Sequence, residues 1–199
     1  PWCIPTIRRI LQHPLNCQLS IKKMKTYTEI EMLNLYRAHL GLSRTLVLPA
    51  ESERHPMDRE LLNELHARYR RLLATEPAEL LPVEDVGAEC RATPEGADRM
   101  VITLGDRCIR PVSLQLATWQ EAVYRFHAAG SALHRRQRFP LLRANVARPA
   151  VFRSADRLLV YGTGSGAQLP MPAVELRAVA APKDGTFRLS ESLLDKLFQ

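Results

Sequence analysis

The sequence lacks the features that would indicate an enzyme or a metalloprotein directly. Its six histidines and four cysteines form no HExxH or CxxC pattern, so neither a metal site nor any other cofactor is expected. No GxSxG elbow or comparable nucleophile signature occurs. No window approaches the roughly 18 consecutive apolar residues of a transmembrane helix, and we expect no contact with a membrane. These absences favour a non-enzymatic protein.

Cysteine is scarce and unevenly placed. Cys3 and Cys17 lie near the start, and only Cys90 and Cys108 fall in the rest of the chain. These two could pair across a hairpin, but free buried thiols are the stronger expectation in a chain of 199 residues. Such thiols fit a cytoplasmic, reducing setting, and the sequence shows no secretory signal.

Residues 1–23 have no acidic residue and differ in composition from the rest of the chain. They carry Arg8, Arg9, Lys22 and Lys23, which supply four of the seven net positive charges. The first methionine is Met24. We interpret this basic leader as upstream sequence read in frame or as a disordered segment; a transit peptide is the alternative. Residues 24–199 are expected to form a single α+β domain, with a helical part at 24–86 and a β-rich part at 87–199.

Acidic residues are also absent from the whole stretch between Ala122 and Ala155. This stretch contains two histidines, His127 and His134, and seven arginines: Arg125, Arg135, Arg136, Arg138, Arg143, Arg148 and Arg153. One interpretation is a contact with phosphates or with an acidic protein surface. The other is a set of solvated side chains paired with acids elsewhere in the fold, such as Glu79, Glu84 and Asp85. The aromatic residues nearby do not follow an RNA-recognition pattern, so base-specific readout is not indicated.

Periodicity predicts the secondary structure. Helices are expected at 28–40, where Thr28 and Glu31 match a capping box, and at 58–74, with a last helix capped by Ser190. Residues 99–116 resemble a β-hairpin turning at Gly105-Asp106, with Pro111 placing its second strand at an edge or a bulge. The region 119–139 is expected to be mostly helical with a break near Gly130 and a second short helix capped by Ser131. A loop is expected at 141–149, and further strands are predicted at 150–154, 156–162 and 173–179.

A glycine-rich loop, GTGSG at 162–166, comes directly after a predicted strand. A phosphate-binding turn would require a helix to start at once beyond it, but the next residues are AQLPMP. We therefore interpret it as a flexible loop between strands, leading to an extended segment at 169–172. The predicted fold is α+β, with amphipathic N-terminal helices, a small, mainly antiparallel sheet with interleaved short helices on one side, and a C-terminal helix.

The order of features in the second half resembles a family of phage structural proteins. The segments CIRPVSLQLATWQEAV and SALHRRQRFPLLRANVARPAVF are followed by a strand ending at Tyr161 and by the terminal SESLLDKLF. These segments are similar to structural proteins of Bacteroides-type prophages, which in turn resemble the head-to-tail adaptor (tail tubular, connector) proteins of short-tailed phages. The matching positions are Leu114, Leu116, Trp119, Gln137, Arg148, Pro149 and Tyr161. All of these except Arg148, which is one of the candidate partner-binding arginines, are expected to be structural. The family's LPxDF lead-in is replaced here by GDRCIRP, and no matched motif is catalytic.

The resemblance implies a non-enzymatic adaptor that forms a ring with its own copies and binds a portal-like protein. Such a protein would be cytoplasmic during assembly and then part of the virion. The arginines would face an acidic portal surface or make non-specific contact with DNA. The alternative is a nucleic-acid-binding accessory protein that uses the arginine-rich stretch 125–153.

Overall fold

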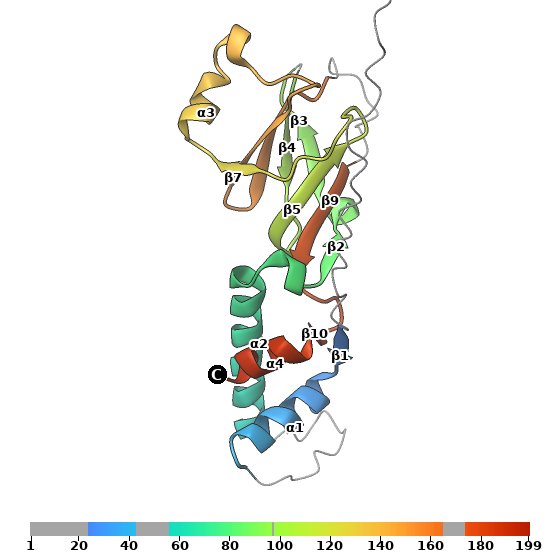
Figure 1. The fold of residues 1–199 in the computed structure, drawn as a ribbon, viewed down its shortest axis with the longest axis vertical. Coiled ribbons are helices and arrows are strands. Elements are labelled where there is room, and N and C mark those ends of the chain that lie inside the picture. Colours follow the sequence, from blue (N-terminus) through green and yellow to red (C-terminus); the bar gives the residue numbers. More distant parts are fainter. Residues whose placement is uncertain (1–23, 43–55, 97, 165–173) are drawn as a thin grey trace, which may run out of the picture.

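The computed structural model describes residues 24–42, 56–96, 98–164 and 174–199 (Figure 1). Within these ranges the helices are α1 (Glu29–His39), α2 (Pro56–Thr75), α3 (Ala132–Arg136) and α4 (Glu191–Phe198), with 3₁₀ turns at Ala78–Leu80, Gly87–Glu89 and Pro140–Leu142. The strands are β1 (Lys25–Tyr27), β2 (Val83–Asp85), β3 (Arg91–Pro94), β4 (Arg99–Thr103), β5 (Cys108–Leu116), β6 (Phe126–Ala128), β7 (Ala150–Ser154), β8 (Arg157–Tyr161), β9 (Val174–Ala180) and β10 (Phe187–Leu189). The α+β class is confirmed. The leader 1–23, the segment 43–55 and the stretch 165–173, which includes the last two residues of the glycine-rich loop, lie outside the described residues.

Helices α1, α2 and α4 form one end of an elongated molecule (Figure 1). Thr28 caps α1 as predicted: its Oγ1 accepts from the Glu31 N–H at 3.2 Å, and Glu31 Oε2 accepts from the Thr28 N–H at 2.8 Å. The buried face of α1 is formed by Met32, Leu33 and Tyr36, whereas Ile30 is exposed.

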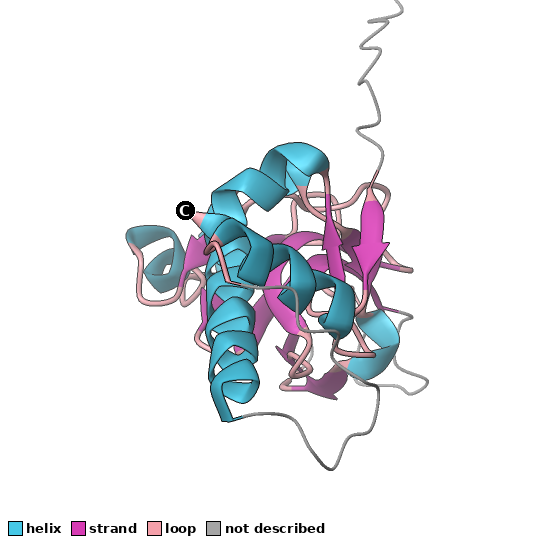
Figure 2. Ribbon diagram, turned by 90° about the horizontal axis from the view of Figure 1, so that it is seen from below, coloured by secondary structure: helices cyan, strands magenta, loops and turns pink. Residues whose placement is uncertain are grey.

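The core of the helical end includes residues from both ends of the described chain. Strand β1 pairs with β10 in an antiparallel ribbon, and the ring of Phe187 packs on Tyr69 of α2. From α4, Leu193 and Leu197 are buried in the same core. Ser190 is the N-cap residue of α4, as predicted, but its side chain makes no capping hydrogen bond and lies 3.0 Å from the Ser192 hydroxyl. Viewed from below, the helices cover the ends of the strands (Figure 2). The core of the helical end is therefore completed by β10 and α4, so this part of the fold extends beyond the predicted range 24–86.

Two sheets pack face to face in the middle of the molecule. One has the order β2-β9-β5 and the other β3-β4-β8-β7-β6, and all neighbours are antiparallel except β6 and β7. Both sheets contribute to one apolar core, with Ile102 and Leu158 from the larger sheet and Leu114 and Leu176 from the smaller one, all fully buried. This arrangement is a small sandwich.

The hairpin predicted at 99–116 is wrong. Strand β4 pairs with β3 and β8, whereas β5 pairs with β9 in the other sheet. The turn at Gly105-Asp106 thus carries the chain from one sheet to the other, which local sequence does not distinguish from a hairpin turn. Pro111 does lie on an edge strand with irregular register, as predicted, because β5 ends its sheet and its pairing shifts between Pro111 and Ser113.

The helix predicted from residue 119 up to Gly130 is also wrong. The segment runs as a loop into β6, and Val123 makes an antiparallel bridge with Leu114 of β5. Trp119 is buried instead by the chain that leaves β8: its indole N–H donates to the carbonyl oxygen of Gly162 at 2.7 Å. Between residues 119 and 139 only α3 is helical. Its N-cap residue is Ser131, as predicted.

Candidate interaction surface

Residues 131–144, here called the tip, project from the sandwich at the end opposite the helices α1, α2 and α4 (Figure 1). The tip consists of α3, a connecting turn and the 3₁₀ turn that starts at Pro140. Ser131 begins it, because its Oγ accepts a hydrogen bond from the His134 N–H at 3.3 Å. Pro140 stands at the first position of the 3₁₀ turn, where a missing N–H costs nothing.

His134 fixes the tip to the sandwich. Its Nδ1 accepts from the Gly130 N–H at 2.9 Å, and its Nε2 lies 3.2 Å from the Tyr161 hydroxyl. The imidazole also packs on Phe152 with ring centroids 4.7 Å apart. Burial, followed by the charges of Arg99 and Arg138, lowers the pKa of His134. The ring is therefore neutral near pH 7 and acts as an anchor rather than as a charge.

Gln137 holds the tip closed from within. Its side chain is almost fully buried; Oε1 accepts from the Ala144 N–H at 2.8 Å and Nε2 donates to the Leu133 carbonyl at 3.2 Å. Its own carbonyl accepts from Arg143 Nε at 3.2 Å. One side chain thus bridges the helix α3 and the returning part of the loop, so that residues 138–143 form a fixed protrusion.

The predicted arginines are all exposed, but they do not form one continuous patch. Arg135, Arg136, Arg138 and Arg143 lie on the tip, and Arg148 comes just after it. Arg153 points away, because its guanidinium donates to the Ile109 carbonyl on β5 at 3.2 Å. There it lines a shallow hollow of about 400 Å³ together with Pro111, Phe126, His127, Ala128 and Ala155. Arg125 precedes β6 and makes no ion pair within the described part of the chain.

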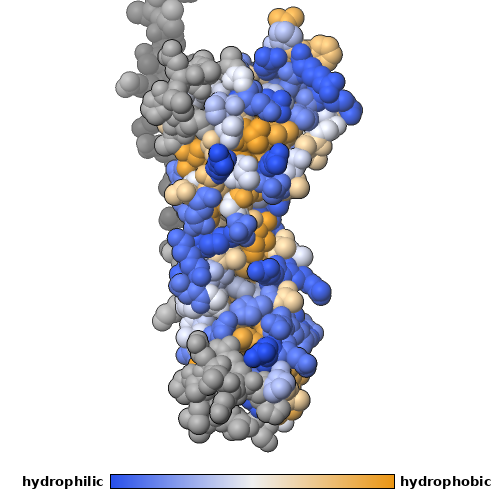
Figure 3. Space-filling model, turned by 180° about the vertical axis from the view of Figure 1, so that it is seen from behind, coloured by the Kyte–Doolittle hydropathy of each residue, from blue (hydrophilic) through white to orange (hydrophobic). Residues whose placement is uncertain are grey.

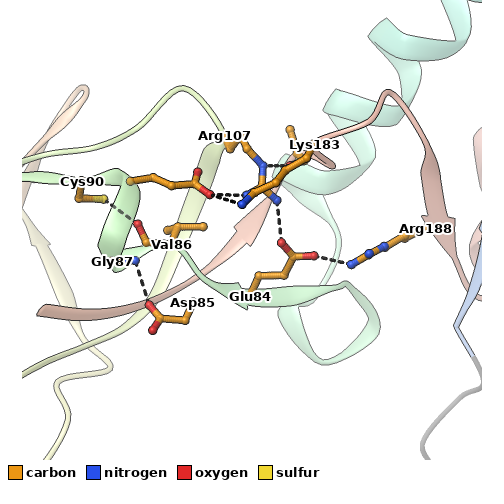
Figure 4. A network of polar contacts seen from close by, with 10 residues as sticks. Glu84, Asp85, Val86, Gly87, Cys90, Arg107, Lys183 and Arg188 are labelled. Atoms are coloured by element: carbon orange, nitrogen blue, oxygen red, sulfur yellow. Dashed lines mark hydrogen bonds and ion pairs between the residues drawn. The ribbon is translucent and has the colours of Figure 1, made fainter.

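Pairing of these arginines with the predicted acidic partners is not observed. Glu84 pairs instead with Arg107, at 2.6 Å, and with Arg188 (Figure 4). Asp85 accepts from the backbone N–H groups of Gly87 and Leu176. Among the described residues, none of the seven arginines forms an ion pair with a carboxylate. Within the described part of the chain, the positive charge of the tip is thus not neutralised by neighbouring carboxylates.

Three apolar side chains stand among the arginines of the tip. Leu141 is 98% exposed, Phe139 60% and Leu142 58%. Seen from behind, the projection carries hydrophobic and strongly hydrophilic residues side by side (Figure 3). The sequence predicts only a loop beyond Pro140, and no role for these side chains. The signal that could have identified them is the segment FPLL itself. It is an apolar run within a basic stretch, and its proline ends the predicted helix, so the leucines belong to no predicted helix or strand that would bury them.

The described thiols and histidines form no reactive constellation. Cys90 and Cys108 are free and half-buried. Burial, together with the neighbouring Cys90, raises the pKa of Cys108 to about 11, so that this thiol is protonated at neutral pH. Within the described ranges no cluster of His, Cys, Asp and Glu could hold a metal ion. None of the described helices is long and apolar enough to cross a bilayer.

The residues expected to be structural lie beneath the tip and in the sandwich core. Leu114, Leu116, Trp119, Gln137 and Tyr161 are buried, and Pro149 is half-buried where the chain enters β7. Tyr161 at the end of β8 supports the tip through its contact with His134, Gln137 closes the tip from within, and Trp119 bonds to the Gly162 carbonyl just beyond β8. When the chain was compared with known proteins, no family, no curated protein and no solved structure matched it.

Proposed function

We propose that this chain is a non-enzymatic structural protein that binds protein partners during the assembly of a phage-like particle, in the manner of a head-to-tail adaptor. The observation that carries the proposal is the tip, where exposed arginines that pair with no carboxylate among the described residues surround exposed apolar side chains on a fixed support. Such a combination is typical of protein interfaces, which are enriched in arginine and aromatic residues.

The resemblance supplies the partners of this proposal: a portal-like protein and further copies of the chain in a ring. The elongated shape, with helices at one end and the tip at the other, suits a subunit that contacts different neighbours at its two ends (Figure 1). The protein would be cytoplasmic during assembly and virion-associated afterwards.

Light scattering of the full chain, alone and with a portal protein from the same genome, tests the proposal. We expect either a ring of copies or a monomer that assembles only on the portal. A chain that stays monomeric up to high micromolar concentration and ignores the portal would rule the adaptor function out.

The arginines without carboxylate partners favour a second candidate, a nucleic-acid-binding accessory protein. In that case log affinity for duplex DNA falls with log salt by about 0.9 per phosphate contacted. Replacing Arg135, Arg136 and Arg138 with Ala would then reduce this slope by about three. The matched control replaces Arg59, Arg70 and Arg71, three exposed arginines of α2, with Ala. Equal slopes in all three proteins would exclude DNA binding through the tip.

A further inference from the structure

The conformation of the tip is fixed before any partner binds. Gln137 closes the loop with hydrogen bonds of 2.8 and 3.2 Å, Ser131 caps its helix, and His134 joins it to Tyr161. A preorganised surface loses little conformational entropy on binding. The small entropy loss favours binding only when the partner has a surface of matching shape. A fluid bilayer or a flexible nucleic-acid backbone has no such fixed surface.

The apolar residues are too exposed to have a structural role within the described chain. Leu141 is 98% exposed, more than any other large apolar residue described, and Phe139 and Leu142 stand beside it with more than half of their surface free. Phosphate contacts would use the arginines alone and would leave these three side chains in water. The three residues therefore indicate a partner with an apolar recess.

The charge around these residues has one sign. Arg135, Arg136, Arg138 and Arg143 are exposed on the tip, and no Asp or Glu occurs between Ala122 and Ala155. A guanidinium group forms bidentate hydrogen bonds with carboxylates, so the complementary rim is a ring of Asp and Glu side chains.

We infer that the tip is a plug for a protein partner: Phe139, Leu141 and Leu142 enter an apolar socket, and the surrounding arginines pair with carboxylates on its rim. The inference rests on the proposed function in taking the partner to be a protein, but it defines the recognition chemistry independently of any portal. The partner is an acidic, amphipathic protein surface rather than DNA or lipid.

The test uses the full chain and a synthetic amphipathic helical peptide with leucines on one face and glutamates on the other. Two variants probe the plug: Phe139→Ser/Leu141→Ser/Leu142→Ser removes the apolar centre, and Arg135→Gln/Arg136→Gln/Arg138→Gln removes charge. Their matched controls are Leu35→Ser/Leu40→Ser, at the helical end, and Arg59→Gln/Arg70→Gln/Arg71→Gln on α2. All the substituted side chains are exposed, and circular dichroism verifies that each variant folds.

We expect the peptide to bind the wild-type chain and both controls equally, and each plug variant to bind at least about tenfold more weakly, or about 1.4 kcal/mol. Duplex DNA and vesicles rich in anionic lipid are titrated in parallel. Failure of the peptide to bind, or peptide binding that is insensitive to the apolar variant, overturns the inference. Tight binding to DNA or to vesicles with no binding of the peptide overturns it as well, in favour of those ligands. Peptide binding that depends on the plug, in a chain that ignores the portal, would refute only the adaptor function.

Discussion

At Gly162 the chain that leaves β8 lies directly against the segment beyond the tip. Its φ is +82°, and a Cβ added there would lie 2.4 Å from the Asn145 carbonyl oxygen. Its own carbonyl accepts the Trp119 indole N–H, and its N–H donates to the Asp98 carbonyl. Any larger residue must therefore both adopt a left-handed backbone and push Asn145 away.

We expect Gly162→Ala to lower the free energy of unfolding by about 2–4 kcal/mol, because strain and steric clash add. Gly130→Ala is the matched control, since Gly130 has φ +81° but no atom within 4 Å of an added Cβ. The control should lose only the backbone term of about 1 kcal/mol. Urea denaturation of both variants measures the difference. Equal losses of unfolding free energy would show that the contact with Asn145 does not contribute to stability.

Arg37 and Asp58 form the most deeply buried ion pair described, joining α1 to the first turn of α2. Arg37 Nη1 lies 2.9 Å from Asp58 Oδ1, and the two side chains are only 13% and 6% exposed. Arg37→Ala leaves the carboxylate buried without its partner, and we expect a loss of about 3 kcal/mol in unfolding free energy. The exposed Arg59→Ala, in the same turn of α2, should change stability by less than about 0.5 kcal/mol. A cost for Arg37→Ala no larger than that of Arg59→Ala would contradict this role of the pair.

At the scale of elements, the hairpin of β7 and β8 turns through a residue that is poorly suited to its conformation. The two strands are joined by Ala155 and Asp156, and Ala155 has φ +48°, the one positive value among the described non-glycine residues. Ala155→Gly should stabilise the protein by about 1 kcal/mol, because glycine adopts this conformation without steric cost. Ala128→Gly on β6, with an ordinary φ, should destabilise it instead. Thermal unfolding monitored by circular dichroism decides: a lower melting temperature for Ala155→Gly would show that the turn is not strained.

Elements whose identity is set by their own residues could be predicted, and those set by distant residues could not. Thr28 and Glu31 cap α1 with each other, and the leucines of α2 repeat at helical spacing, so both helices were accessible to sequence reasoning. Strands β7, β8 and β9 are short runs rich in valine, leucine and aromatic residues, and were predicted as well. The partner of β5 is β9, which lies far along the chain, and nothing between Cys108 and Leu116 specifies that choice over β4.

The same distinction applies to the candidate surface. The lack of acidic residues between 122 and 155 is a property of the sequence, and it predicted a basic region. Whether the arginines pair with Glu84 or Asp85 depends on the fold. In the structure Glu84 pairs with Arg107 and Arg188, and Asp85 accepts hydrogen bonds from backbone N–H groups. The exposure of Leu141 also depends on the fold, because Gln137 turns the loop outward from inside.

At the scale of the whole molecule, one polar network spans the junction between the helical end and the sandwich (Figure 4). Arg107 pairs with Glu84 of β2 and with Glu89, each at 2.6 Å, and its Nε donates to the Ala181 carbonyl. Lys183 reaches Glu89 at 3.3 Å. The network therefore connects three segments that meet where β9 leaves its sheet towards β10.

This network makes stability depend on pH in the acidic range. Partial burial would raise the pKa of Glu89, but the hydrogen bonds and charges of Arg107 and Lys183 outweigh it and hold the pKa below its ordinary value of 4.5. A carboxyl whose pKa is lower in the folded state stabilises the fold above its unfolded pKa, and loses that contribution as pH falls through the folded value. We therefore expect the urea midpoint to decrease as pH is lowered from about 5 towards 3.

Arg107→Met removes the main partner of Glu89 and should make this acid-induced decrease shallower, while it also lowers the midpoint at pH 7. Arg91→Met, on the exposed face of β3, is the matched control and should retain the wild-type pH profile. The midpoints at about pH 7, 5 and 3.5 for the three proteins measure the effect. A decrease in Arg107→Met as steep as in the wild type would place the acid sensitivity in other carboxyl groups, and would leave the network as a geometric link between the two ends of the molecule without a pH-dependent role.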